Sequence, residues 1–513
     1  MSKAATLLLC FITTTLFATD QAFVPFYANE EDRLKDIEQS SVFNAYQKDG
    51  EYADLQEKLR TLVNDQGLQD GIVAFHLIKA SNNDVIFTHN ARRYFRPASN
   101  MKVLSSTYAL NTLGEDFKFE TKLYYRTSSS NAEKIIFVIR GDGDPSISNN
   151  YNRLGAAQNR FLQEVTDAIV TKANELNFDL NDESKEIEIQ LDDTIFPRQF
   201  SNLNWSYHDF GRCYGAPVGG LQIDKSCHSV TVSAGAPGSQ PSITHHNGIK
   251  TSVVIKNNLI AQNQQRNWVN YLINPLGVEI LASGSVMANR KTVEKFPVVD
   301  PTLYFGEFVL NAVKKKVKSK VTTSKLGKKF FSIQSPIYTF ESKELKTLAI
   351  PLMKWSDNQF AESFMMRPTP WKNLVSSLIG FKKFLKETVK MKVDTARIED
   401  GSGVSQFNYL RPVDLVQVLI YNYADSARFE TFKKTLPIAG VDGTLRKRMK
   451  ETAAYKKVWA KTGTISRSAT LSGYVEDSRG ELYIFSAMVN NNSNGAWSAR
   501  KLQDKLLHEV ASY

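Results

Sequence analysis

Three short strings contain the groups that a serine acyl-transfer enzyme without a catalytic histidine needs. In chain order they are Ser99-Asn100-Met101-Lys102, Ser356-Asp357-Asn358 and Lys461-Thr462-Gly463. A serine hydroxyl is a weak nucleophile until a neighbouring base takes its proton, and an uncharged lysine amine can be that base. Residues three apart on a helix share a face, so Lys102 is placed to act on Ser99. The residue types therefore predict nucleophilic catalysis.

The second and third strings supply the remaining groups of such a site. A serine and an asparagine can relay protons and hold substrate amides, which is the role predicted for Ser356 and Asn358. A Lys-Thr-Gly strand can bind a substrate carboxylate and offer backbone N–H groups to an oxyanion. The order of the strings carries the prediction, because Ser-x-x-Lys alone recurs at Ser498-Ala499-Arg500-Lys501. The predicted substrate-binding residues are Lys461, Thr462, Gly463 and Thr464.

An amphipathic helix is predicted directly after the first string. Pro97 precedes Ser99, and apolar residues recur at helical spacing from Met101 to Leu110, before Gly114. The nucleophile therefore opens a helix, where unpaired N–H groups favour a developing negative charge.

Both ends of the chain predict parts of one antiparallel sheet with flanking helices. Near the N-terminus we expect a helix over 51–68 and strands over 71–78 and 85–87. Near the C-terminus we expect strands over 469–475 and 482–489 and a helix over 497–510. Hairpins join antiparallel strands, so the predicted class is α+β.

The long interval between the first two strings is rich in strand-like segments, for example 119–125, 134–139, 187–191, 229–233 and 252–255. At 513 residues the chain exceeds what one core usually organises. We predict a discontinuous catalytic domain over 23–115 and 331–513, with a β-rich insertion over 116–330 that contains two nested domains.

The N-terminus has the pattern of a secretory signal peptide over residues 1–22. Lys3 precedes an apolar run that ends at Phe17 and is too short to span a bilayer, and the small residues Ala18 and Ala22 follow. We expect export to the periplasm; an uncleaved anchor is the alternative. Cleavage would remove Cys10 and leave Cys213 and Cys227, which suggests one disulfide, with two buried thiols as the alternative.

Charge and motifs restrict the partners and cofactors. The formal net charge is +11, with a lysine cluster between Lys314 and Lys329 that suits wall polymers, anionic lipid or simply a solvated face. No basic motif interleaved with aromatic residues is present, so nucleic acid is not expected. Despite His245-His246 we find no metal-binding pattern, and Gly141-Asp142-Gly143-Asp144-Pro145 is expected to be a turn. We expect neither metal nor cofactor; peripheral membrane contact and a homodimer are left open.

Taken together, the strings resemble those of the class C low-molecular-mass penicillin-binding proteins, the D-alanyl-D-alanine carboxypeptidase/endopeptidase family of penicillin-binding protein 4-like serine peptidases. The resemblance covers nearly the whole mature chain. It rests on Pro97-Ala98-Ser99-Asn100-Met101-Lys102, Gly141-Asp142-Gly143-Asp144-Pro145, Tyr214-Gly215-Ala216-Pro217-Val218, Ser356-Asp357-Asn358 with Ala361-Glu362, Asp400-Gly401-Ser402-Gly403, 436–445 and Lys461-Thr462-Gly463-Thr464.

This resemblance implies a penicillin-recognising domain of the β-lactamase/transpeptidase type. It implies hydrolysis of peptidoglycan stem peptides through an acyl-serine, and covalent inhibition by β-lactam antibiotics. It also implies a disulfide between Cys213 and Cys227. The implied roles are nucleophile for Ser99, base for Lys102, proton relay for Ser356, positioning for Asn358, carboxylate binding for Lys461, Thr462 and Thr464, and an oxyanion hole from the N–H groups of Ser99 and Thr464.

One departure from the family pattern concerns substrate detail. Members often carry an arginine after Ser-Gly-x-Ser, whereas Ser402-Gly403-Val404-Ser405 is followed by Gln406. A glutamine cannot clamp a carboxylate bidentately as an arginine does. Arg411 is a nearby candidate to replace it. Two alternative functions are a serine β-lactamase, which is normally far shorter, and an inactive wall-binding scaffold, which the intact motifs disfavour.

Overall fold

The computed structural model describes residues 50–64, 71–128, 131–151, 155, 157–197, 204–246, 254–273, 279–330, 335–370 and 373–513. The predicted signal peptide over residues 1–22 and Cys10 lie outside the described residues, as do the first two residues of the strand expected over 252–255. None of the helices in the described ranges is long and apolar enough to cross a membrane.

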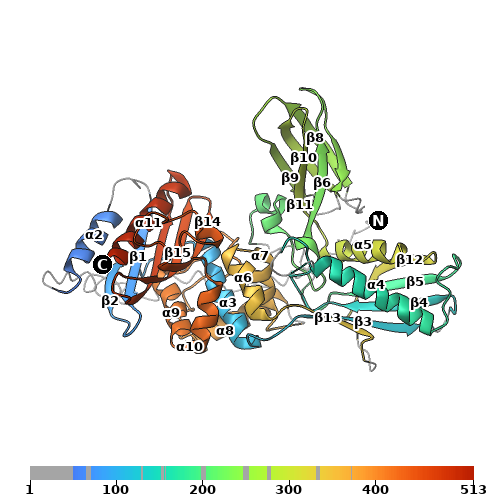
Figure 1. Ribbon diagram of the computed structural model, residues 1–513, viewed down its shortest axis with the longest axis horizontal. Coiled ribbons are helices and arrows are strands. Elements are labelled where there is room, and N and C mark those ends of the chain that lie inside the picture. Colours follow the sequence, from blue (N-terminus) through green and yellow to red (C-terminus); the bar gives the residue numbers. More distant parts are fainter. Residues whose placement is uncertain are drawn as a thin grey trace, which may run out of the picture. The chain divides into compact units, whose positions relative to one another are not determined.

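Strands from both ends of the chain form one antiparallel sheet of five strands (Figure 1). Its order is β14 (Val458–Ile465), β15 (Ser468–Glu476), β16 (Leu482–Asn490), β1 (Ile72–Lys79) and β2 (Val85–His89). The central pairing joins the two ends, because Ile72 lies opposite Asn490 and Lys79 opposite Tyr483. Strand β14, which carries the Lys-Thr-Gly string, is an edge strand.

Helices cover both faces of this sheet. On one face, α2 (Ala53–Val63) and α11 (Gly495–Ser512) pack their leucines on the sheet around Phe75 and Phe485. The other face, with Tyr474 and Met488, packs on a helical layer. The helices on that side are α3 (Met101–Leu113), α6 (Leu345–Lys354), α7 (Asn358–Met366), α8 (Leu374–Glu387), α9 (Pro412–Tyr423) and α10 (Ser426–Thr435). The predicted α+β fold is confirmed.

Helix α3 differs from the amphipathic helix that its sequence predicts. Every residue from Met101 to Ala109 is buried, polar ones included. Neighbouring helices satisfy several of the polar groups; Asn422 of α9, for example, donates to Thr107 Oγ1 over 2.8 Å. The helix that follows Ser99 is therefore enclosed by the helical layer rather than lying on its surface.

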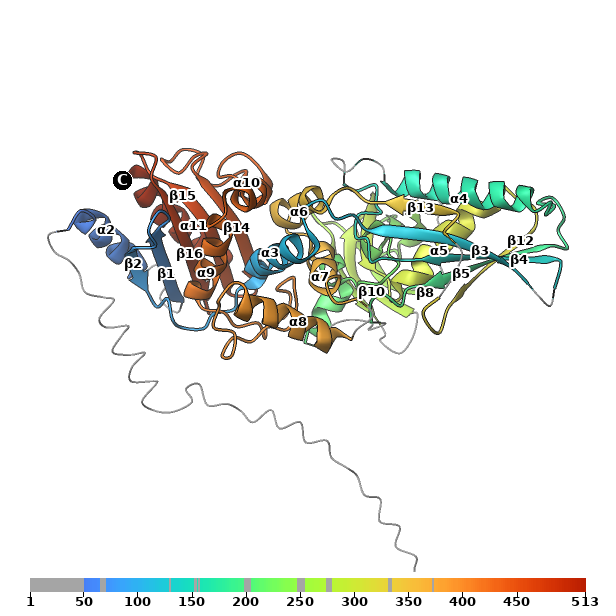
Figure 2. The ribbon, with the colours of Figure 1, turned by 90° about the horizontal axis from the view of Figure 1, so that it is seen from below.

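The insertion contains a second five-stranded sheet, which is mixed. Its order is β12 (Lys320–Lys325), β5 (Glu186–Asp192), β4 (Lys134–Arg140), β3 (Glu120–Thr127) and β13 (Tyr338–Glu341). Strand β5 runs parallel to both β4 and β12. Helices α4 (Ala157–Glu175) and α5 (Pro301–Lys314) pack on it through Phe161 and Phe305 (Figure 2). Neither helix was predicted from the sequence. The insertion was predicted to end at residue 330, whereas the strands of this sheet continue to Glu341.

Two small sheets form a further unit inside the insertion. One contains β11 (Lys291–Pro297), β6 (Cys227–Ser233) and β7 (Ser242–His245), and the other β8 (Val254–Gln262), β10 (Glu279–Met287) and β9 (Trp268–Ile273). Val232 and Phe296 of the first sheet share a core with Leu259 and Ile280 of the second. A disulfide joins Cys213 to Cys227 with 5.7 Å between the Cα atoms, which confirms the predicted pairing.

Candidate active site

Ser99 lies in a short 3₁₀ turn, Ala98–Asn100, that leads directly into α3. One helical turn later, Lys102 places its Nζ 2.9 Å from Ser99 Oγ. The same amine donates to Asn358 Oδ1 over 2.6 Å and to the carbonyl oxygen of Ser402 over 2.5 Å. The spacing of the first string therefore produces the predicted serine–lysine contact.

The Lys102 side chain is completely buried. Burial lowers the pKa of its ammonium to about 8, although the carboxylates of Asp400, Glu362 and Asp357 act in the opposite direction. An amine with this pKa is partly uncharged near neutral pH and can accept a proton from Ser99. Burial is thus the cause of the lowered pKa of Lys102.

The second string follows α6. Ser356 has a positive φ of 61°, an uncommon conformation for a residue with a side chain. Asp357 then caps α7, because its Oδ1 accepts a hydrogen bond from the Gln359 N–H over 3.1 Å. Asn358 is the first residue of α7, and its side-chain amide forms two hydrogen bonds. Its Oδ1 accepts from Lys102, and its Nδ2 donates to the Tyr214 carbonyl oxygen over 2.7 Å.

Residues of the insertion hold this second string from outside. Tyr151 OH donates to Asp357 Oδ2 over 2.8 Å, and Lys225 Nζ lies 3.1 Å from the same oxygen. Tyr214, which bonds Asn358, directly follows the disulfide-bonded Cys213. The sequence offered no signal for these contacts, since they join positions more than a hundred residues apart.

Lys461 of β14 faces the second string. Its Nζ donates to Ser356 Oγ over 2.9 Å and to the Thr462 carbonyl oxygen over 2.6 Å. Burial, and after it the positive charge of Lys102, holds the pKa of Lys461 well below its usual range. Like-charge repulsion between the two lysines therefore acts on Lys461. Both serines of the site have a buried amine at hydrogen-bond distance.

Gly463 allows β14 to lie directly against the turn that contains Ser99. A Cβ at this position would be 2.2 Å from Thr470 Oγ1, 2.8 Å from the Pro97 carbonyl oxygen and 3.0 Å from the Ser99 nitrogen. Thr470 also donates to the Pro97 carbonyl oxygen over 2.8 Å. The glycine of the third string is thus required by packing, because any side chain would push Ser99 away from the strand.

Thr462 and Thr464 line one pocket of about 680 Å³ with Ser99 and Ser356. Thr462 Oγ1 donates to Thr444 Oγ1 over 2.8 Å. Arg500 of α11 donates through Nη2 to Thr464 Oγ1 over 3.0 Å. The sequence analysis missed Arg500 as a site residue, and it noted this segment only as a second Ser-x-x-Lys string. In the structure Ser498 instead bonds the Gly495 carbonyl oxygen.

Two buried carboxylates fix the loop that bounds Lys102. Glu362 accepts hydrogen bonds from the N–H groups of Ser402 and Gly401, and Asp400 accepts them from Gly403 and Ser405. Burial raises the pKa of both acids, and the charge of Asp400 adds to the effect on Glu362. The loop presents the Ser402 carbonyl oxygen to Lys102.

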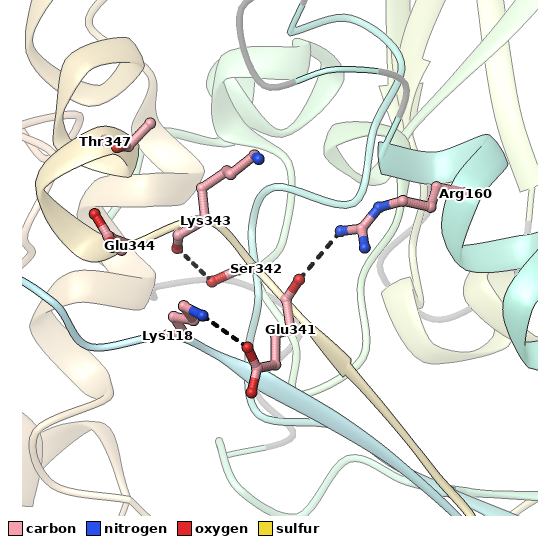
Figure 3. Close-up of a pocket in the computed structure, with 7 residues that line it drawn as sticks. All are labelled: Lys118, Arg160, Glu341, Ser342, Lys343, Glu344 and Thr347. Carbon is pink, nitrogen blue, oxygen red and sulfur yellow. Dashed lines mark hydrogen bonds and ion pairs between the residues drawn. The ribbon is translucent and has the colours of Figure 1, made fainter.

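A second pocket, of about 540 Å³, lies where β13 leads into α6 (Figure 3). There Lys118 pairs with Glu341 Oε2 at 2.8 Å, and Arg160 donates to the Glu341 carbonyl oxygen over 3.1 Å (Figure 3). The seven side chains drawn there include no serine beside a lysine amine. Of these two pockets, the one with Ser99 contains the serine and lysine groups that acyl transfer needs.

The comparison with family models agrees with this geometry. The model of the D-Ala-D-Ala carboxypeptidase 3 (S13) family matches residues 55–510. The chain belongs to this family. A D-alanyl-D-alanine carboxypeptidase of Actinomadura sp. (strain R39) is 25% identical over 485 residues, which cover 90% of this chain and 85% of the relative. The D-alanyl-D-alanine carboxypeptidase DacB of Haemophilus influenzae is 23% identical, covering 86% of this chain and 88% of the relative.

A solved structure shares the fold of this S13 family member. The crystal structure of penicillin binding protein 4 (dacB) from Haemophilus influenzae superposes with a TM-score of 0.73 at 20% identity, covering 90% of this chain and all (100%) of the other.

Gln406 follows Ser402-Gly403-Val404-Ser405, at the position where the family resemblance leads one to expect an arginine. Arg411, which we considered as its replacement, instead donates to Asp414 through Nε and Nη2 at the start of α9. Its guanidinium is therefore paired with the Asp414 carboxylate, which itself caps α9 by accepting a hydrogen bond from the Arg411 N–H over 2.8 Å.

Proposed function

We propose that this protein is a serine-type D-Ala-D-Ala carboxypeptidase and DD-endopeptidase that acts on peptidoglycan stem peptides through an acyl-Ser99 intermediate. The observation that carries the proposal is the contact between Ser99 Oγ and the buried Lys102 Nζ, 2.9 Å apart, with the pKa of Lys102 lowered to about 8. A reactive serine needs such an adjacent base.

In the acylation step, Lys102 takes the proton of Ser99, and Ser99 Oγ attacks the carbonyl carbon of the penultimate D-alanine. The N–H groups of Ser99 and Thr464 stabilise the oxyanion that forms. Ser356, beside Lys461, gives its proton to the leaving amine as the carbon–nitrogen bond breaks, and it regains one from the protonated Lys102. The oxygen of a water molecule then attacks the acyl carbon while Lys102 takes its proton; the ester bond to Ser99 Oγ breaks, Lys102 returns the proton to Ser99, and the shortened peptide leaves as a carboxylate.

Thr462, Thr464 and Arg500 bind the carboxylate of the leaving residue in this account. Both hydroxyls line the pocket with Ser99, and Arg500 adds a positive charge at Thr464. β-Lactams acylate the same serine and act as covalent inhibitors.

We further propose export to the periplasm, as the signal peptide pattern indicates. We also propose the predicted discontinuous catalytic domain, supported by one sheet that contains strands from both ends of the chain.

The test is direct. Purified protein is incubated with a peptide that ends in D-Ala-D-Ala, and free D-alanine is measured over time. We expect release by the wild-type protein and none by Ser99→Ala. Rapid turnover of penicillin instead of peptide would favour a β-lactamase, and absence of both reactions would contradict the proposed function.

A further inference from the structure

The pocket that contains Ser99 continues into a basic surface, of which the proposed mechanism uses only Arg500. Twelve residues line the pocket, and five of them are cationic whereas one, Asp504, is acidic. Arg448 donates to Asp504 Oδ1 over 2.9 Å from Nε and 2.6 Å from Nη2, so those two charges offset each other. The remaining cations are Arg446, Lys447, Arg500 and Lys501. Within the described residues, no carboxylate forms an ion pair with these four.

This basic surface lies on the side of the site where the leaving group departs. Ser356 and the two threonines of β14, which handle the leaving amine and its carboxylate in the proposed mechanism, line the same pocket. Thr462 bonds Thr444 and Thr464 bonds Arg500, so residues 444–448 and α11 extend the pocket outward from the carboxylate-binding threonines. A leaving segment longer than one residue would pass over them.

Two exposed tryptophans lie near cations of this surface, and Trp497 also lines the pocket. Lys501 Nζ lies 3.7 Å from the ring centre of Trp497, and Arg446 Cζ lies 5.9 Å from that of Trp355. The rings are 66% and 51% exposed, so their outer surfaces are open to a ligand. Contact with a ring restrains a flexible cationic side chain along the pocket wall. Cations held in this way suit a peptide that carries several carboxylates.

We propose that Arg446, Lys447 and Lys501 form an anion-binding subsite for the leaving segment when that segment is a second, polyanionic stem peptide. The inference rests on the proposed function, because it takes the bond that is cut to be the one attacked by Ser99. A single D-alanine carries one carboxylate, for which the two threonines and Arg500 suffice. A cross-linked stem peptide carries further carboxylates beyond that group. The subsite therefore favours cleavage of cross-links over removal of a terminal D-alanine.

The double variant Lys447→Met/Lys501→Met tests this proposal while keeping the methylene stems of both side chains. Two substrates are compared: a linear peptide ending in D-Ala-D-Ala, and a dimer of two stem peptides joined through D-alanine. We expect kcat/KM for the dimer to fall about tenfold, as the loss of two partly exposed ion pairs implies. The linear peptide and the rate of penicillin acylation should change less than about twofold.

Lys383→Met/Lys505→Met is the matched control, because it removes two exposed lysines that do not line the pocket. Its dimer cleavage should equal that of the wild-type protein, and added salt should reduce dimer cleavage more for wild type than for the pocket variant. Unchanged dimer cleavage by the pocket variant, an equal loss on both substrates, or the same loss in the control would overturn the subsite. If the wild-type protein cleaves neither peptide and is not acylated by penicillin, the proposed function itself is refuted, and the subsite with it.

Discussion

Arg500 Nη2 donates a hydrogen bond to Thr464 Oγ1 over 3.0 Å. The two residues come from different elements, since Arg500 lies on the C-terminal helix α11 and Thr464 on the edge strand β14. Thr464 is the residue whose hydroxyl is proposed to bind the substrate carboxylate. A carboxylate at that hydroxyl would lie within reach of the guanidinium, and charge-assisted hydrogen bonds are the stronger kind.

Replacing Arg500 with methionine should therefore weaken substrate binding. We expect KM for a D-Ala-D-Ala peptide to rise between about tenfold and about a hundredfold, which corresponds to the loss of one hydrogen bond to a charged group. Arg500→Lys should recover part of the loss, because it restores the charge without the fork of donors. Steady-state kinetics measure both, with Lys505→Met on the same helix as the control. An unchanged KM in Arg500→Met would show that the guanidinium does not meet the carboxylate.

The rate of acylation should depend on the protonation of Lys102. Its pKa is lowered from 10.5 to about 8, and only the uncharged amine can accept the proton of Ser99. The rate of acylation by penicillin should rise with pH and reach half its plateau at about pH 8. The unfolded chain would hold this proton up to about 10.5, so the same group makes the fold more stable as pH rises between about 8 and 10.5. A rate that falls with pH across this range would argue against Lys102 as the base.

Gly463→Ala should damage the site through packing. The added methyl group would lie 2.2 Å from Thr470 Oγ1 and 3.0 Å from the Ser99 nitrogen, so the turn of the nucleophile must move. We expect the free energy of unfolding to fall by about 2 kcal/mol. Acylation by penicillin should slow by at least about a hundredfold, since small displacements of a reacting group have effects of that size. The control is Gly327→Ala, whose methyl group meets no atom within 4 Å. Equal behaviour of the two variants would contradict the packing argument.

The disulfide should increase both the stability of the fold and the rate of acylation by penicillin. It closes a loop with a sequence separation of 14, and Cys213→Ala/Cys227→Ala should lower the free energy of unfolding by about 3 kcal/mol. Acylation should also slow, because Tyr214 next to Cys213 orients the Asn358 amide that bonds Lys102. Denaturant titration and acylation rates measure the two effects. A less stable variant that is acylated at the wild-type rate would show that the loop does not position Asn358.

The contacts among the proposed catalytic groups were predictable because these groups are local or ordered along the chain. Ser99 and Lys102 meet through helical spacing, and hairpins indicated the antiparallel sheet that carries Lys461. What the sequence concealed depends on contacts between distant segments. Arg500 reaches Thr464 only because α11 packs on the sheet, and Tyr151 reaches Asp357 only across the insertion. Helix α4 was missed because the surrounding strand-like segments dominated the pattern.

The parallel pairing of β4 with β5 was also beyond a hairpin-based prediction, since it needs the crossover that α4 provides. Helix α3 has apolar residues at helical spacing, which predicts one buried face. Its polar residues are buried as well because neighbouring helices supply their partners. The sequence pattern identifies the face that must be buried, whereas only the assembled helical layer shows that the other face is covered too.

The central claim is that Ser99 is acylated with Lys102 as its base. The most direct measurement is mass spectrometry of the protein after incubation with penicillin, with the adduct located by peptide mapping and Lys102→Met treated in parallel. We expect one adduct, on the peptide that contains Ser99, and a loss of at least about a thousandfold in its rate of formation in Lys102→Met. No adduct on the wild-type protein, an adduct on another peptide, or undiminished labelling of Lys102→Met would contradict it.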